Sequence, residues 1–345
     1  MRIVVIGPEQ ADSLPKCSAE NLRLLGHDVL SIDERKILGT SLEKDTLKGK
    51  IKKWSIIKLR TADYLMKIFP HIENRLYVKI ANHAENFNPD LILTHSTWVP
   101  PSPLRELKKK TKAKIACWFP DHPANLGRQY LLSGCYDYLF FKDKYLVKMA
   151  NRINQNAFYL PECCDPRWHN KIELSEKDLA IYGCDVTIAG NIYHYRAKIF
   201  EELSKICKIK IWGPPIPRWL DTPINKLHQN KTVTETEKAK AFLSSKIVVN
   251  TFQGEVEGVN LRTFEAAGSG AFQICEYRKE LEELFHVGEE IETFQNIDEL
   301  KEKIKFYLEN PQKRKEIAEK GYLRAHKDHT YEKRLSELVS HIERK

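Results

Sequence analysis

The stretch that decides the fold starts with the apolar run Lys246-Ile-Val-Val-Asn250 and continues through Gln253-Gly-Glu-Val-Glu-Gly-Val-Asn-Leu-Arg-Thr-Phe-Glu-Ala-Ala-Gly-Ser-Gly270. A short apolar run predicts a buried strand, and the glycine-bearing segment after it predicts a loop. The residues after the loop predict a helix that begins near Asn260. Strand, loop and helix in succession are the repeating unit of an α/β fold.

Two carboxylates lie on either side of this predicted helix start. Glu257 falls in the loop and Glu265 inside the helix, eight residues apart. A helix N-terminus at the end of a strand presents unpaired N–H groups and a partial positive charge, which favour a phosphate. A carboxylate on each side can accept hydrogen bonds from the vicinal hydroxyls of a ribose and of a hexose. The pattern therefore predicts a site for a sugar nucleotide.

The composition is that of a globular protein with room for two domains. The 345 residues are 42% hydrophobic and 30% charged, and a chain of this length can form two cores. No apolar run approaches the roughly 18 residues of a membrane span. The run at Met1–Gly7 is too short for a signal peptide and predicts a first strand. The eight cysteines include no Cys-x-x-Cys pair, so we expect buried free thiols and a cytoplasmic protein.

The positive charge is concentrated in the first half of the chain. Residues 1–165 hold 26 Lys and Arg against 18 Asp and Glu, whereas the remainder holds 30 against 29. This excess is compatible with an anionic partner and equally with plain solvation. Residues 46–60 form a basic amphipathic stretch that could contact a membrane surface or a polyanionic acceptor. The same pattern is also that of an ordinary helix packing its apolar side on a sheet.

Strands alternate with helical patterns along both halves, which predicts two doubly wound α/β domains. We expect an N-terminal domain over residues 1–168 and a nucleotide-sugar-binding domain over residues 169–328. We expect residues 329–345 to form a helix that crosses back onto the first domain. In such folds ligands bind at the C-terminal ends of the parallel strands, so the two domains are expected to face each other across a cleft.

The first domain carries polar side chains directly after predicted strands. Asp121 and His122 follow the run Lys114–Phe119, and His95 follows Leu91–Thr94. A carboxylate or imidazole at the end of a strand can meet an acceptor and take or relay a proton. A histidine there is also compatible with a structural role in the core. We therefore expect Asp121 to be the catalytic group, ahead of His122 and then His95.

Two turns of the second half add candidates for the donor site. Gly190-Asn-Ile-Tyr-His-Tyr-Arg196 follows a predicted strand, and its backbone can approach an anion closely. Arg196 is suited to a diphosphate because a guanidinium binds phosphate oxygens bidentately, although a surface arginine at a helix start gives the same pattern. Trp212-Gly-Pro-Pro215 follows another strand; it could bring backbone groups near a base, or Trp212 could fill the core. Arg262 could face a diphosphate or a structural carboxylate, and Asn260 could be the N-cap of its helix.

Several stretches together resemble the CgeB-like (spore maturation protein) glycosyltransferases, which are retaining enzymes of the GT-B class. The resemblance runs from about residue 90 to the end and is strongest after 180. The matching stretches are Trp118-Phe-Pro-Asp-His-Pro123, Tyr136-Asp-Tyr-Leu-Phe140, Tyr159-Leu-Pro161 with Asp165-Pro166, Asp185-Val-Thr-Ile-Ala-Gly190 with Tyr193 and Arg196, Lys246–Asn250, Gly258-Val-Asn-Leu-Arg-Thr-Phe-Glu-Ala-Ala267, Gly270-Ala-Phe272 and His329-Thr-Tyr331.

This resemblance implies a GT-B fold and transfer of a sugar from a nucleoside diphosphate, with UDP as the expected donor group, to an unknown acceptor. Glu257 and Glu265 reproduce the E-x7-E signature of the class, so Glu257 would hold the hydroxyls of the donor sugar and Glu265 those of the ribose. The reaction would retain the anomeric configuration by front-face displacement, without a metal and without a cofactor. The donor-binding residues are expected to be Glu265, Arg196, Arg262, Asn260, Gly190, Asn191, Trp212, Gly213 and Gly258, and the catalytic ones Glu257, Asp121 and His122.

Other functions remain compatible with the sequence. A sugar-nucleotide 2-epimerase shares the architecture but needs no acceptor. A nucleic-acid-binding or nucleic-acid-modifying protein would use the basic first domain, although no recognisable nucleic-acid motif is present. A non-catalytic sugar-nucleotide binder would not need the intact pair of Glu257 and Glu265.

Overall fold

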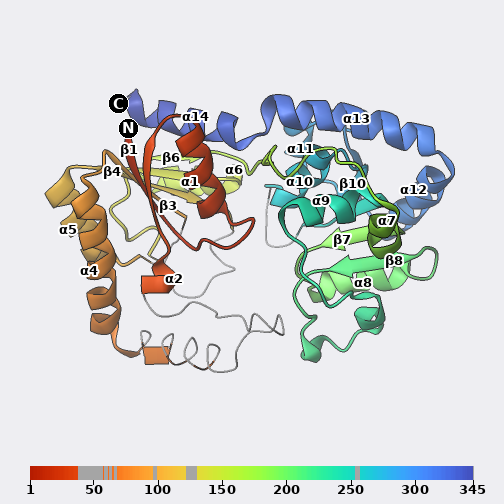
Figure 1. Ribbon diagram of the computed structural model, residues 1–345, viewed down its shortest axis with the longest axis horizontal. Coiled ribbons are helices and arrows are strands. Elements are labelled where there is room, and N and C mark those ends of the chain that lie inside the picture. Colours follow the sequence, from red (N-terminus) through yellow and green to blue (C-terminus); the bar gives the residue numbers. More distant parts are fainter. Residues whose placement is uncertain are drawn as a thin grey trace. The chain divides into compact units, whose positions relative to one another are not determined.

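The computed structural model describes residues 1–37, 57, 61, 64, 65, 68–95, 99–121, 130–252 and 257–344. The chain divides into two compact units (Figure 1). The first unit consists of Met1–Leu160 together with Leu335–Lys345, and the second of Pro161–Arg334. The sequence placed this boundary after residue 168, in the same Pro-containing segment. The crossing of the last helix falls within that helix, at residue 335, and not at its start.

The first unit is built on a six-stranded parallel sheet with the strand order β2-β1-β3-β4-β5-β6. Its inner strands are buried except for Arg2 and Lys114, which begin two of them, as expected for a parallel sheet that helices cover on both faces. The strands are β1 (Arg2–Ile6), β2 (Asp28–Ile32), β3 (Leu91–Thr94), β4 (Lys114–Phe119), β5 (Tyr138–Phe141) and β6 (Ala157–Tyr159). The helices are α1 (Leu14–Leu24), α2 (Glu34–Ile37), α4 (Pro70–Phe87), α5 (Pro101–Thr111) and α6 (Lys144–Arg152).

Local signals in the sequence set the ends of these helices. Ser13 caps α1 by accepting the backbone N–H of Lys16, and Asp143 caps α6 by accepting that of Tyr145. Proline stands in the first turn of α1, α4 and α5, where its missing N–H costs nothing. The last helix, α14 (Tyr331–Glu343), begins in the second unit and ends in the first. There the His341 ring packs 4.6 Å from that of Phe158.

The second unit has a five-stranded parallel sheet with the strand order β11-β10-β9-β7-β8. The strands are β7 (Cys184–Ala189), β8 (Ile209–Trp212), β9 (Ser245–Asn250), β10 (Gln273–Glu276) and β11 (Glu292–Phe294). The helices are α7 (Glu176–Tyr182), α8 (His194–Leu203), η2 (Arg218–Leu220), η3 (Pro223–Leu227), α9 (Glu235–Leu243), α10 (Leu261–Ser269), α11 (Leu281–Leu284), α12 (Ile297–Glu309) and α13 (Pro311–Asp328).

This strand order reverses between β7 and β9. From β7 the chain passes to β8 on one side, and it then returns to β9 on the other side of β7. In open α/β sheets, ligands bind outside the C-terminal ends of the strands at such a reversal. The segments that leave β7 and β9 carry most of the predicted donor-binding residues, and Trp212 and Gly213 lie at the end of β8.

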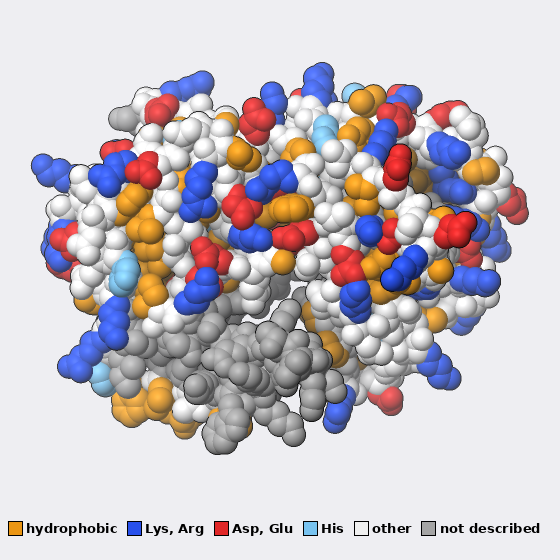
Figure 2. All heavy atoms as spheres, viewed as in Figure 1, with side chains coloured by type: hydrophobic (Ala, Val, Ile, Leu, Met, Phe, Trp, Pro, Cys, Tyr) orange, Lys and Arg blue, Asp and Glu red, His pale blue; other side chains and the backbone are white. Residues whose placement is uncertain are grey.

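The cysteines are free, and the surface carries charges of both signs. All eight cysteines are free, and burial raises the pKa values of Cys117 and Cys275 to about 12. On the face shown in Figure 2, basic and acidic side chains alternate over the described residues and form no basic patch. None of the described helices combines the length and the apolar character needed to cross a membrane.

Candidate donor site

The site is built on the ends of β7 and β8, where two glycines let the backbones approach. Gly190 and Gly213 have φ values of +137° and +148°, which strain any residue with a Cβ. The Gly190 N–H donates to the carbonyl of Trp212 at 2.8 Å. A Cβ on Gly213 would collide with the carbonyl of Gly190, and one on Gly190 would collide with the guanidinium of Arg262. Both glycines are therefore required by the geometry at this edge of the sheet.

Arg262 and Arg196 hold their guanidinium groups at the ends of β7 and β9. Arg262 donates from Nε to the carbonyl of Ala189 at 2.6 Å and from Nη1 to Oδ1 of Asn250 at 2.9 Å. Arg196 is 5% exposed and donates to the hydroxyl and the carbonyl of Thr251 at 2.8 and 2.9 Å. It also donates to the carbonyl of Asn191. Two permanent positive charges are thus fixed at the strand reversal.

Asn260 occupies the N-cap position of α10, but its side chain caps nothing. Its amide instead forms a reciprocal pair with Asn250, with both N–O distances at 3.0 Å, and reaches the carbonyl of Thr251 at 3.1 Å. Asn250 also donates to the hydroxyl of Thr263 at 3.0 Å. The polar network locks the end of β9 to the first turn of α10 and keeps the Asn260 side chain turned away from the N–H groups of that turn.

Glu265 is a buried carboxylate one turn inside α10. The residue is 4% exposed, in a helix whose residues from Thr263 to Ser269 are all buried. Nζ of Lys238 on α9 donates to its Oε1 at 2.7 Å. Burial acts to raise the pKa of Glu265, but Lys238, His169 and Arg262 favour the ionised form and outweigh burial, so the pKa lies below its ordinary value. A buried ionised carboxylate beside fixed cations is typical of functional sites.

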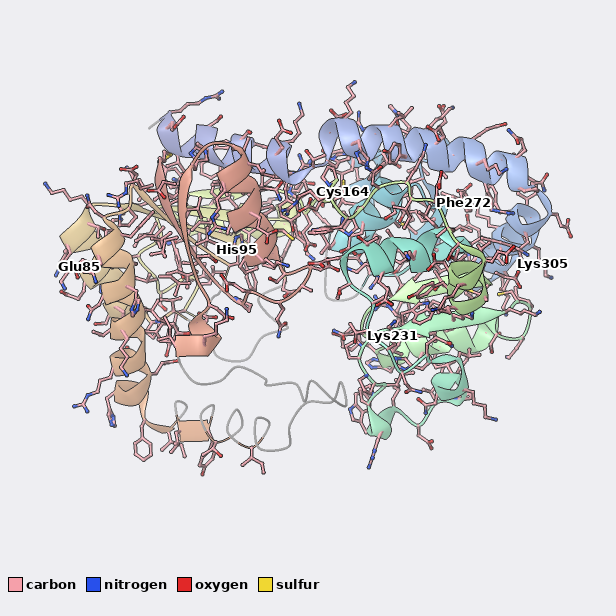
Figure 3. All side chains as sticks on the ribbon, in the orientation of Figure 1. Glu85, His95, Cys164, Lys231, Phe272 and Lys305 are labelled. Carbon is pink, nitrogen blue, oxygen red and sulfur yellow. The ribbon has the colours of Figure 1, made fainter. Side chains whose placement is uncertain are left out.

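Residues 164–169, at the start of the second unit, also pack against α10. The Asp165 N–H donates to Nδ1 of His169 at 3.0 Å, so the ring carries its proton on Nε2. That Nε2 lies 3.7 Å from Oε1 of Glu265. The same segment packs closely on α10, because a Cβ at Gly268 would collide with the side chain of Cys164. Cys164, labelled in Figure 3, donates its S–H toward the carbonyl of His329 at 3.2 Å.

The loop between β9 and α10 is described in part. Residues 253–256 lie outside the described residues, Glu257 is exposed and Gly258 is buried. Where the loop leaves β9, the N–H of Phe252 donates to Oε2 of Glu276 at 2.9 Å. Glu257 and Glu265 are therefore in contrasting environments, because Glu257 faces water and Glu265 lies in the packed interior.

Trp212 belongs to the core. It is 2% exposed, and its ring centroid lies 5.1 Å from that of Tyr182. Of the two interpretations that the sequence left open, the structure thus supports the core role for its side chain. The turn after it is anchored by the Gly213 N–H, which donates to the carbonyl of Lys231 at 2.9 Å; Lys231 is labelled in Figure 3.

The catalytic candidates that the sequence placed in the first unit follow the ends of two different strands. Asp121 is exposed directly after β4, and His122 lies outside the described residues. His95 is buried, and its Nδ1 lies 3.0 Å from the carbonyl of Trp118. Burial lowers the pKa of His95 to about 4, so the ring is neutral at pH 7. Of the basic stretch 46–60, only Ile57 is described, and it is exposed.

Sequence reasoning missed the polar residues that hold the site together. Asn250 ends β9 and Thr251 follows it, and they are 0% and 1% exposed. The sequence feature that could have identified them is a pair of polar residues at the end of an apolar strand. Lys238 had no comparable signal, because it is one of two lysines on α9 and meets Glu265 only through the fold.

Comparison with known proteins agrees with this geometry. Residues 196–340 match a family model described as glycosyl transferase-like. The whole chain has the fold of sucrose-phosphate synthase from Thermosynechococcus elongatus, with a TM-score of 0.67 at 11% identity and coverage of 100% of this chain and 98% of that one. The corresponding values for a glycosyltransferase from Rickettsia africae are 0.65, 14%, 98% and 97%. For the Anabaena protein HepE, solved with UDP and glucose, they are 0.64, 12%, 99% and 99%. Comparison with curated proteins finds no match.

The fold and the family match define the class of this protein. Two parallel sheets with flanking helices are the GT-B architecture. The matched range contains both arginines, Glu257, Glu265 and the helix α10. The chain is therefore a glycosyltransferase with a GT-B fold.

Proposed function

We propose that this protein transfers a sugar from a UDP-sugar to an acceptor, with retention of configuration and without a metal ion, as a CgeB-like glycosyltransferase. The observation that carries the proposal is the cluster at the reversal between β7 and β9. There Arg196 and Arg262 are fixed on the strand ends, and Glu265 is held ionised one turn into α10. The UDP-bound structures of HepE, which has the same fold, favour UDP as the carrier.

In this proposal the protein acts by positioning and by charge. The two guanidinium groups and the N-terminus of α10 bind the diphosphate and stabilise the negative charge that grows on it as the glycosidic bond breaks. Glu265 accepts hydrogen bonds from the ribose hydroxyls, and Glu257 from the hydroxyls of the donor sugar. The leaving diphosphate assists attack on the same face, so the anomeric configuration is kept.

The acceptor side of the proposal rests on Asp121, with His122 as the second candidate. A carboxylate exposed after β4 can accept a proton from an acceptor hydroxyl. The excess of positive charge in residues 1–165 favours an anionic acceptor. Replacement of Asp121 by Asn should reduce transfer while leaving UDP affinity unchanged, as measured by isothermal titration calorimetry.

A thermal-shift panel of nucleoside diphosphates and their sugars, with and without EDTA, tests the donor. UDP and one UDP-sugar should raise the melting temperature, because a ligand that prefers the folded state stabilises it. The shift should be the same with EDTA. A response to another base, or one that EDTA removes, would refute that part of the proposal.

NMR of the product's anomeric proton tests the stereochemistry. The product should have the anomeric configuration of the donor, and an inverted product would exclude the front-face mechanism. Release of free sugar or an epimerised donor without any acceptor would identify the epimerase reaction instead.

The Glu265→Ala variant should weaken donor binding, and Glu257→Ala should abolish transfer.

A further inference from the structure

The contact between Lys238 and Glu265 joins two helices across the interior of the second unit. The Lys238 side chain is 12% exposed and that of Glu265 is 6% exposed, with 2.7 Å between Nζ and Oε1. Burying the Lys238 ammonium and the Glu265 carboxylate together carries a high desolvation cost. Lys238 is thus placed directly against the carboxylate that the proposed function assigns to the ribose.

The two side-chain contacts described for the Glu265 carboxylate converge on one of its oxygens. Lys238 and His169 both approach Oε1, at 2.7 and 3.7 Å. Within the described residues, no hydrogen bond is made to Oε2. The carboxylate is therefore held by one oxygen, and the other can accept hydrogen bonds from a ligand.

The groups around Glu265 come from several elements. Lys238 faces it from α9 and His169 from the segment before α7, while Arg262 lies one turn earlier on α10 itself. On α13, His326 contacts the backbone carbonyls of His169 and Gly268. The nearby Cys164 thiol is neutral at pH 7, because burial raises its pKa to about 12.

We propose that Lys238 is a positioning residue that orients the Glu265 carboxylate toward the ribose and makes the donor site selective for ribonucleotides over dideoxyribonucleotides. This inference rests on the proposed function. A site built to bind hydroxyl groups rejects a ligand that lacks them, since its polar atoms are then left unpaired. The discrimination depends on a carboxylate that is both charged and fixed, and Lys238 provides both conditions.

The test compares the affinities of UDP and 2′,3′-dideoxy-UDP by isothermal titration calorimetry. The variants are Lys238→Met, which keeps the length of the side chain without its charge, and Lys238→Arg, which keeps the charge. Lys240→Met is the matched control, because Lys240 lies on the same helix and pairs with Asp178 at 3.0 Å. The wild type should prefer UDP by about tenfold or more, the value expected for charged hydrogen bonds.

The preference for UDP should fall to within about threefold in Lys238→Met, and it should persist in Lys238→Arg and Lys240→Met. A wild-type preference in Lys238→Met, or an equal loss in Lys240→Met, would overturn the inference. If Lys238→Met does not fold, Lys238→Gln is measured in the same way. A preference within about threefold in that variant supports the inference, and a wild-type preference overturns it. A wild type that binds neither nucleotide would refute the UDP donor instead.

Discussion

At the scale of single residues, the two carboxylates of the E-x7-E pair are chemically unlike. Glu265 is buried and paired with Lys238, whereas Glu257 is exposed at the end of a loop. Removing Glu265 breaks its buried ion pair with Lys238, whereas a substitution at Glu257 changes an exposed position. The same substitution should therefore have different consequences at the two sites.

We expect Glu265→Ala to lower the free energy of unfolding by about 3–5 kcal/mol, the usual cost of breaking a buried ion pair. Glu257→Ala should change it by less than about 0.5 kcal/mol, as surface substitutions do. Urea denaturation followed by circular dichroism measures both values. Equal effects of the two substitutions would contradict the structural difference between these residues.

Replacing Arg262 by lysine tests whether the planar guanidinium group is needed for UDP binding. Its Nε and Nη1 bind Ala189 and Asn250 at the same time, and a lysine cannot reproduce that fork. Arg262→Lys should weaken UDP binding by about tenfold, the loss of about one charged hydrogen bond, and leave uridine binding unchanged. Titration of each variant with both ligands checks the result, and a parallel loss for uridine would place the arginine away from the diphosphate.

The residues of the site were predictable to different degrees. Arg196, Arg262 and Glu265 stand in a local strand–turn–helix pattern, which the fold preserves. Trp212 was ambiguous because an aromatic residue at a strand end suits a core and a binding surface equally. Lys238 could not be predicted, because its partner lies 27 positions further along the chain and only tertiary packing joins them.

At the scale of elements, the two glycines at the ends of β7 and β8 control how closely the strands' turns pack. Gly190→Ala should destabilise the protein by about 2–4 kcal/mol, because strain at positive φ adds to a collision with Arg262. Gly288→Ala is the control, since Gly288 has a φ of +84° with open space around it; it should cost about 1–2 kcal/mol. Melting curves of the two variants separate collision from strain, and equal losses would show that strain alone acts.

The strands were predictable because parallel strands buried on both faces are continuous apolar runs. Lys114–Phe119 has the predicted bounds, and the predicted strand Lys246–Asn250 lies within β9. The helix ends were less predictable. Asn260 is of a residue type that often caps helices, yet its side chain forms a hydrogen bond with Asn250 instead. The basic amphipathic stretch at 46–60 lies largely outside the described residues.

At the scale of the whole molecule, each unit contains a histidine that is buried in its neutral form. Burial lowers the pKa of His95 in the first unit to about 4, and burial with the charge of Arg334 does the same for His329 in the second. The unfolded chain, with histidine pKa values near 6.5, therefore binds more protons than the folded chain between pH 6.5 and 4. Stability rises with pH across that window.

We expect each histidine to lower the free energy of unfolding by up to about 3 kcal/mol as the pH falls from 6.5 to 4. The effect follows from about 1.4 kcal/mol per unit of pKa difference between the unfolded and folded chain. Above pH 7 neither should contribute to the pH dependence. Urea denaturation at pH 7.5, 6 and 5 measures this loss. A stability that is constant from pH 7.5 to 5 would contradict the buried neutral histidines.

The helix α14 also determines the order in which the chain can fold during translation. The first unit includes residues 335–345, where the apolar side of α14 has Leu335, Leu338 and Ile342 almost fully buried. A ribosome releases these residues after the entire second unit has been made. We therefore expect the contacts of His341 with Phe140 and Phe158 to form only after residues 335–345 have emerged.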